Sequence, residues 1–233
     1  MTPTDSKSRS FRPDLFRFLR QLEENNKREW FHANKDLYES SVRHPALQFI
    51  SDFGPHLAKI SRNFSADPRP VGGSLFRIHR DVRFSRDKRP YKTSVGIQFR
   101  HKKAKDVHAP GFYLHLQPGY VFAGIGIWHP DSASLKKIRD ELVANPAGWR
   151  RVVNGKKFSA IYELEGESLK RPPRGYDAEH PLVEDLKRKD FIAVVKLTQN
   201  QVTSPGFLNE YATLCRSGSQ FIKLLCEAIG VPF

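Results

Sequence analysis

The hydrophobic residues of this chain change their spacing twice along the sequence. Near both ends they recur every three or four residues, which is the spacing of an amphipathic helix. Between residues 75 and 128 they alternate with polar residues instead, as side chains do in a strand that buries one face. Such a chain must pack helices from both ends against a central sheet. We therefore expect an α+β fold, with a mostly antiparallel sheet flanked by N-terminal and C-terminal helices.

Helices are predicted on both sides of the central region. Residues 12–24 and 27–42 carry apolar side chains at helical spacing, and a third helix begins at Pro45. Because proline cannot donate a backbone hydrogen bond, we expect a kink or break where Gly54-Pro55 interrupts that helix. Near the C-terminus, one long helix is expected to begin at a Ser204 cap and to end at Gly230, after a loop at 171–175 and a buried strand at 191–197.

Four central segments alternate as strands do: residues 75–80, 93–100, 112–117 and 120–128. The dipeptide Pro118-Gly119 signals a tight turn between the last two. Alternation also assigns side chains to the two faces of the sheet. The apolar, core-facing set is expected to be Phe76, Ile78, Val95, Ile97, Phe99, Phe112, Leu114, Leu116, Val121, Ala123, Ile125 and Ile127.

The ends of the chain and its hydropathy indicate how it is organised. Residues 1–10 are short, rich in serine and lysine, and predicted to be a disordered tail, whereas residues 11–233 are expected to form a single compact domain. No apolar run reaches the roughly 18 residues that a membrane span needs, and the N-terminus lacks an apolar signal segment. We therefore expect a cytoplasmic protein with no membrane partner.

Positive charge is concentrated in the middle of the chain. The formal net charge is +14, and residues 77–105 contain eleven basic residues against Asp81 and Asp87. Clustered arginine and lysine side chains attract anions, and arginine suits bidentate contact with phosphate. We therefore expect an anionic ligand, with nucleic acid as one candidate. The residues expected to bind its phosphates are Arg77, Arg80, Arg83, Lys88, Arg89, Lys92 and Arg100. A solvated basic loop that serves solubility, or one fixed by Asp–Arg pairs, is the structural alternative.

The second face of the predicted sheet collects residues that ligand sites use. Tyr113, His115, Phe122 and Trp128 point to it, and the pair Gly124 and Gly126 leaves room above the backbone. Tyr113, Phe122 and Trp128 could stack on nucleic-acid bases, so Tyr113 and Trp128 join the expected binding residues. The alternative is that the C-terminal helices cover this face and that its aromatic rings are core.

Two further functions stay open. In an enzyme acting on a phosphorylated small molecule, His79 or His115 would be the general acid or base, and Asp81 would orient it. In a structural or adaptor protein, Trp30-Phe31 would mark a partner surface. The sequence contains no Walker loop, dinucleotide fingerprint or zinc-peptidase motif, and the triplet at 79–81 lacks the other kinase motifs. We expect neither a metal nor a cofactor.

Two motifs resemble a family of bacterial and fungal proteins known as domain of unknown function 2461. The first is Asn25-Asn26-Lys27-Arg28-Glu29-Trp30-Phe31, and the second and more specific one runs from Phe76 to Thr93. Segments at 111–115, 124–130 and 135–139 also fit. The resemblance implies one compact cytoplasmic domain and no established activity. The chain departs from the family pattern at Ser94, where a histidine is common, and at Gly124-Ile125-Gly126, where three glycines are common.

Overall fold

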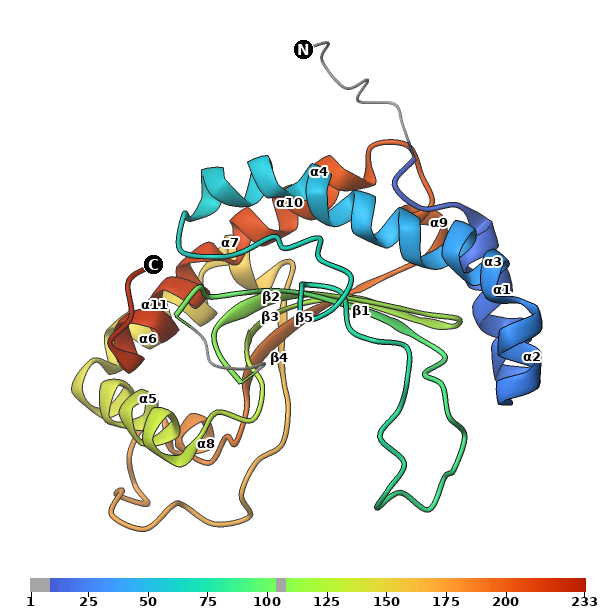
Figure 1. Cartoon of the computed structure of the whole chain (residues 1–233). Helices are drawn as coiled ribbons and strands as arrows, with labels where there is room; N and C mark the ends of the chain where they lie inside the picture. Colours follow the sequence, from blue (N-terminus) through green and yellow to red (C-terminus); the bar gives the residue numbers. More distant parts are fainter. Residues whose placement is uncertain (1–8, 104–107) are drawn as a thin grey trace.

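The computed structural model describes residues 9–103 and 108–233, so the predicted tail lies almost wholly outside the described residues, as does Lys105. Within them lies a five-stranded antiparallel sheet with the order β1-β2-β3-β5-β4 (Figure 1). The expected α+β class and antiparallel sheet are thus confirmed. The strands are β1 (Val95–Arg100), β2 (Gly111–Gln117), β3 (Tyr120–Ile127), β4 (Glu163–Glu165) and β5 (Phe191–Leu197).

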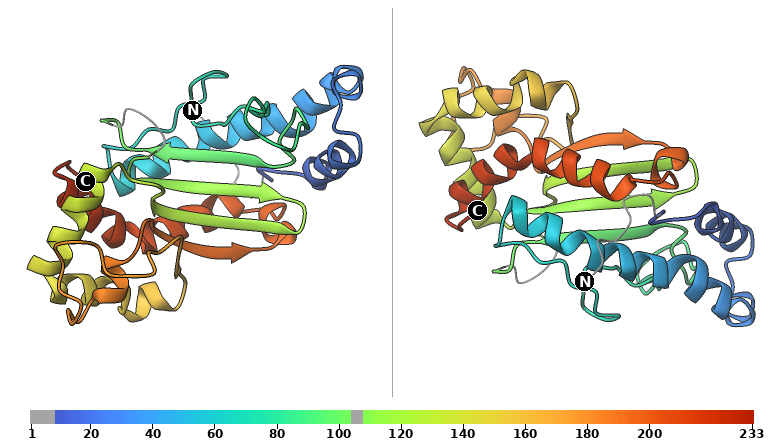
Figure 2. Two further views of the ribbon diagram at one scale, coloured as in Figure 1. Left: turned by 90° about the horizontal axis from the view of Figure 1, so that it is seen from below. Right: turned by 90° about the horizontal axis from the view of Figure 1, so that it is seen from above.

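Helices from both ends of the chain pack on the same face of this sheet. Figure 2 shows α4 and α10 crossing the sheet in the view from above, whereas the strands are open to view from below. The N-terminal helices are α1 (Pro13–Glu24), α2 (Arg28–Ala33), α3 (Lys35–Tyr38) and α4 (His44–Ile60). The later helices are α5 (Ser132–Ala144), α6 (Pro146–Val153), α7 (Lys156–Ser159), α8 (Val183–Leu186), α9 (Gln199–Val202), α10 (Phe207–Ser217) and α11 (Ser219–Ile229).

The covered face is apolar because alternate residues of each strand point to it. One cross-strand row comprises Phe99, Phe112, Ile125 and Ala193, all buried. The ring of Phe53 on α4 lies 4.5 Å from the ring of Phe99 between their centroids. The predicted core-facing residues of the three strands between residues 93 and 128 are all buried, which confirms their assignment.

The prediction of a strand at residues 75–80 is wrong. This segment makes only isolated bridges, Leu75 with Ile97 and His79 with Tyr91, and does not continue the sheet beyond β1. Phe76 is also not a core residue, because its ring packs 6.0 Å from that of Tyr113 on the uncovered face. Alternation reflects burial on one side of the backbone, and here the chain contacts β1 only over residues 74–76 before it leaves the edge of the sheet.

Two predicted helices are divided in the structure. The segment predicted as one helix at 27–42 forms α2, α3 and a π-helical turn at Glu39–Arg43, with Asn34 at the first junction. The last helix is divided at Gly218, where any side chain would collide with Ile125 of β3. It begins after Gly206, in left-handed conformation, rather than at a Ser204 cap. By contrast, α4 continues through Pro55 without a break.

A buried amide holds the segment before β1 against the N-terminal helices. Asn26 Nδ2 donates to the Tyr91 carbonyl oxygen at 3.0 Å, and the Tyr91 backbone N–H donates to Asn26 Oδ1 at 3.1 Å. The Tyr91 ring stacks on Phe31 with centroids 4.1 Å apart. The two motifs that carry the family resemblance therefore meet in space, and their contact fixes where residues 76–92 run.

We predict that Gly126→Ala destabilises the protein by at least about 2 kcal/mol. Gly126 has a φ of +124°, and an added Cβ would collide with the Phe191 carbonyl oxygen. Backbone strain of this kind costs roughly 1–3 kcal/mol before a clash is counted. Chemical denaturation measures the change. The control is Gly124→Ala on the same strand, where the nearest atom is 3.6 Å away and stability should change little. Equal stability of the two variants would contradict the prediction.

Candidate functional site

A cavity of about 540 Å³ lies on the uncovered face of the sheet. This is the size of a pocket that holds a small organic ligand. Strands β1, β2, β3 and β5, together with the residues next to them, form most of its lining, and β4 contributes Glu165. Its lining residues are Phe76, Lys92, Ser94, Gly96, Gln98, Gly111, Tyr113, Tyr120, Phe122, Gly124, Ile125, Gly126, Trp128, Glu165, Ile192 and Val194. The polar face predicted from alternation is therefore open to a ligand rather than covered by helices.

Aromatic rings form much of the cavity wall. The ring centroid of Tyr113 lies 6.0 Å from that of Phe76 and 5.7 Å from that of Phe122, which is itself 5.1 Å from Tyr120. Trp128, half exposed at the end of β3, stacks on His129 with centroids 4.2 Å apart. Rings arranged in this way present flat apolar surfaces on which a planar ligand can stack.

Glycines determine how close a ligand can come to the strands. At Gly96, an added Cβ would lie 2.6 Å from Tyr113 Oη and 2.9 Å from the Phe76 ring, so glycine is what lets both rings rest on β1. At Gly124, an added Cβ would make only ordinary contact, with φ outside the left-handed region. The local backbone therefore does not require glycine at this position, where its effect is to keep the floor of the cavity free.

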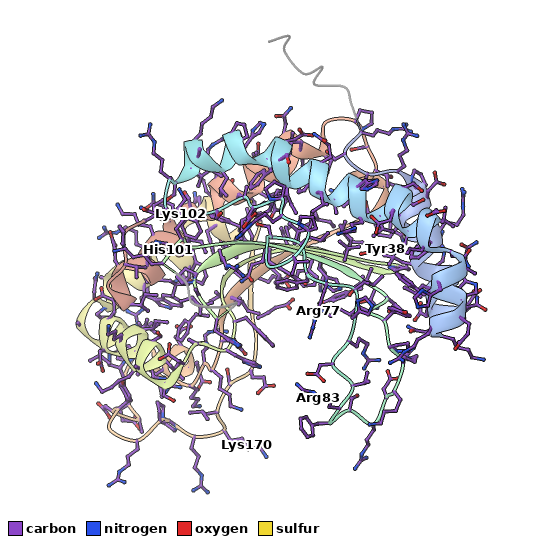
Figure 3. The ribbon with its side chains drawn as sticks, in the orientation of Figure 1. Tyr38, Arg77, Arg83, His101, Lys102 and Lys170 are labelled. Carbon is purple, nitrogen blue, oxygen red and sulfur yellow. The ribbon has the colours of Figure 1, made fainter. Side chains whose placement is uncertain are left out.

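Lys92 lines the β1 end of the cavity, and the Arg77 charge lies close to it without lining the cavity itself. The Lys92 ammonium lies 5.4 Å from the centroid of the Phe76 ring, and burial together with the nearby Arg77 charge lowers the pKa of Lys92. Arg77 is exposed and points below the sheet in Figure 3. Neither side chain makes a hydrogen bond or ion pair with any described residue. Two neighbouring positive charges that make no hydrogen bond or ion pair create a local site for an anion.

Most of the other expected phosphate-binding residues are engaged within residues 80–90, which we call the basic loop. Arg83 contacts Asp81 through Nη2 and Oδ2 at 2.7 Å, and its hydrogen bonds lower the pKa of Asp81 to about 2. Asp87 bonds Arg89 at 2.8 Å and Arg80 at 2.6 Å, and these contacts lower its pKa, with Arg89 the larger cause. The Asp–Arg pairs that offered a structural alternative are therefore present.

The remaining two cations on the expected list also have partners. Lys88 Nζ donates to the Val82 carbonyl oxygen at 3.1 Å, which ties the two sides of the basic loop together. Arg100 Nη2 donates to the Gly72 carbonyl oxygen at 3.0 Å and supports a neighbouring loop. Of the seven cations expected to bind phosphate, Arg77 and Lys92 are thus the two whose charged groups make no hydrogen bond or ion pair among the described residues.

His115 lies behind the cavity in a hydrogen-bonded chain. Its Nδ1 is 3.1 Å from Tyr113 Oη, and its Nε2 is 3.1 Å from Gln117 Oε1. Because Gln117 Oε1 only accepts, Nε2 carries the proton and Tyr113 donates to Nδ1. Burial lowers the pKa of His115 and raises the pKa of Tyr113 to about 12, so both side chains are neutral near pH 7. His115 itself is not among the residues that line the cavity.

The other two expected catalytic residues do not meet at the cavity. Among the described residues, Asp81 bonds Arg83 rather than His79. The His79 ring packs 5.2 Å from that of Tyr91 and 6.4 Å from that of Phe31, on the side of the N-terminal helices. Their catalytic role stays a prediction without a contact that supports it. No group of three described His, Cys, Asp or Glu side chains is placed to hold a metal ion.

Sequence reasoning missed several lining residues. Glu165, Ile192 and Val194 enter the cavity because β5 lies between β3 and β4, a pairing that local spacing does not reveal. Phe76 was assigned to the core because its segment alternates.

The exposed basic residues Lys170, Arg171 and Arg174 belong to a second loop (residues 166–180) that extends from the same side of the sheet as the basic loop (Figure 1). In the sequence, the only feature that could have pointed to these residues is their positive charge, because the segment has no helical or strand-like pattern.

No helix in the described part of the chain has both the length and the apolar character to cross a bilayer.

Comparisons with known proteins give one match. No curated protein matches the sequence. A family model described as "Conserved hypothetical protein (DUF2461)" matches residues 14–223. Because this match includes both motifs and every residue that lines the cavity, the chain belongs to the DUF2461 family of conserved hypothetical proteins.

Proposed function

We propose that the protein binds a phosphate-bearing ligand with a planar ring, a nucleotide or a nucleotide unit of nucleic acid, in the cavity on the uncovered face of its sheet. The observation that carries this proposal is Lys92 in the lining of an aromatic cavity, with the Arg77 charge close to it, and neither charged group makes a hydrogen bond or ion pair with a described residue. Desolvating Lys92 next to a second positive charge is unfavourable on its own. An anionic group bound between the two side chains removes that repulsion.

The rest of the cavity favours a planar group attached to the anion. Tyr113, Phe122 and Trp128 offer ring faces, and base–aromatic stacking contributes roughly 1–3 kcal/mol per base. Ile192 and Val194 add an apolar surface opposite β1. Glu165, at the far edge of the cavity, can accept hydrogen bonds from an amino group or a ribose hydroxyl. Inorganic phosphate alone would leave these surfaces unused.

Titration calorimetry with AMP, ADP and ATP tests the proposal directly. We expect the double variant Arg77→Ala/Lys92→Ala to bind at least about tenfold more weakly, since hydrogen bonds to charged groups contribute roughly 1.5–3 kcal/mol and 1.4 kcal/mol is a factor of ten. The control is Arg151→Ala/Lys157→Ala, which removes the same charge from exposed sites on α6 and α7. If the Arg77→Ala/Lys92→Ala variant still shows saturable binding, or if both variants lose the same affinity, Arg77 and Lys92 do not form a specific phosphate site. Adenosine and pyrophosphate, each lacking half of the ligand, should bind more weakly than ADP.

Proton uptake on binding is expected at alkaline pH. Burial and Arg77 lower the pKa of Lys92, so in the free protein this side chain loses its proton at a lower pH than an ordinary lysine does. A bound phosphate favours the charged form and raises that pKa again. Between the lowered and the raised pKa, binding therefore takes up a proton. Calorimetry in buffers of different ionisation enthalpy measures this uptake, which Lys92→Arg should abolish. A wild-type enthalpy that is independent of buffer throughout this range would refute the role of Lys92.

A second candidate, an enzyme that acts on a phosphate ester, is favoured by the Tyr113–His115–Gln117 chain. A hydroxyl in the cavity bonded to a neutral, oriented histidine is the arrangement that proton transfer needs. Tyr113 Oη would accept a proton from a water that attacks the phosphorus, its own proton would move to His115 Nδ1, and the ester oxygen would leave with the broken P–O bond. Arg77 and Lys92 would stabilise negative charge that develops on the phosphate.

For this candidate we expect His115→Gln and Tyr113→Phe to lower the rate of phosphodiester hydrolysis by about 10²–10⁴ while nucleotide affinity changes little. The probe is bis(p-nitrophenyl) phosphate. Because a base must be unprotonated, and burial lowers the pKa of His115, wild-type activity should reach its plateau at a lower pH than an ordinary histidine allows. Turnover that is undetectable, or that both variants retain, would eliminate this candidate without touching the binding proposal.

A further inference from the structure

The tip of the basic loop holds an aromatic ring in solvent. The side chain of Phe84 is 95% exposed, the highest value among the large hydrophobic residues of the described chain. Its only cationic neighbour over the ring face is the Arg83 guanidinium, 5.8 Å from the ring centroid, among the described residues. An isolated apolar ring in water gains nothing for stability, so its placement calls for another explanation.

The loop is braced in a way that keeps this ring exposed. The Asp81–Arg83 pair precedes the tip and the Asp87 pairs follow it, while Lys88 Nζ donates to the Val82 carbonyl oxygen across the base of the tip. These contacts fix the backbone on both sides of Phe84 without covering its ring. A loop that only served solubility would need no such bracing.

The charges around the ring identify the chemistry of a partner. Arg83, Arg86 and Lys88 are exposed around the tip, and Arg86 makes no hydrogen bond or ion pair with a described residue. The loop at 166–180 presents Lys170 on the other side of the uncovered face, as Figure 3 shows. Basic side chains with one exposed aromatic ring match a chain of phosphates with unstacked bases.

We propose that the ligand is single-stranded nucleic acid, with one nucleotide in the cavity and a further base stacked on Phe84. The cavity end of this assignment rests on the function proposed above. Arg77 lies beside the sheet and Arg83 farther along the loop (Figure 3). An extended chain spans about 3.3 Å per residue, so the backbone from Arg77 to Arg83 can reach up to about 20 Å. A ligand that occupies the cavity and also stacks on Phe84, the residue after Arg83, is a polymer rather than a single nucleotide. A single ring without apolar neighbours is a small anchor for a bilayer, which disfavours a lipid partner.

Fluorescence anisotropy of a labelled twelve-nucleotide single strand, as DNA and as RNA, tests the loop apart from the cavity. We expect Phe84→Ala to weaken binding of the oligonucleotide at least about fivefold and to leave AMP affinity unchanged. Phe84→Trp should keep or improve oligonucleotide binding, because stacking needs only a ring. The matched control is Val71→Ala, which truncates a side chain that is 86% exposed but lies outside the basic loop. The exposure of Phe84 means that truncation should not affect folding, and circular dichroism checks this.

The outcomes separate the two proposals. Oligonucleotide affinity that is no higher than AMP affinity, or that Phe84→Ala leaves unchanged, overturns the assignment to a polymer. Oligonucleotide binding that depends on Phe84 but not on Arg77 and Lys92 supports the loop contact and overturns the cavity as its second anchor. Cosedimentation with vesicles of phosphatidylserine and phosphatidylcholine is the last arm. Vesicle binding that requires Phe84, with oligonucleotide binding unaffected by Phe84→Ala, would assign the loop to a membrane surface instead.

Discussion

Helices from both ends of the chain pack on the same face of the sheet, and the candidate site depends on that one-sided burial. An antiparallel sheet needs one buried face for stability, and its other face can meet solvent. Phe99 of the covered face lies against Phe53 of α4 and Tyr211 of α10, and Phe112 and Ile125 belong to the same buried core. The opposite side chains of the same strands, Tyr113 and Phe122 among them, are therefore free to form a binding surface.

Long-range contacts decide which charges face that surface. The Asn26 amide and the Phe31 ring hold Tyr91, and this contact places Lys92 at the β1 end of the cavity. Asp81 and Asp87 neutralise arginines within the basic loop and fix its shape. The charges of the 77–92 motif thus have two roles: the Asp–Arg pairs build the loop, and the cations that make no hydrogen bond or ion pair remain for a ligand. This division explains how the structural and the functional interpretation of the motif both apply.

The sequence predicted the elements whose pattern is local. The three strands between residues 93 and 128 bury the residues that alternation assigned, because the period of side chains in a strand is fixed by backbone geometry. It failed at Phe76, where alternation occurs beside a sheet edge, and at Gly218, where one predicted helix is divided and the backbone lies against the Ile125 side chain. In the site, Tyr113, Trp128 and Lys92 were predicted to bind and do line the cavity, whereas Glu165 and Val194 were not expected there.

The amino-acid sequence by itself determined that helices near both ends enclose a central antiparallel sheet, which residues share the polar face of the sheet, and that positive charge is concentrated before β1. These properties depend on residue type and on spacing over a few positions. Only the tertiary structure decided that the polar face is open, that Arg83 and Arg89 are paired, and that Arg77 and Lys92 are not. Those outcomes depend on which distant segments come together, as Asn26 and Tyr91 do across 65 residues of chain, and local spacing contains no information about such contacts.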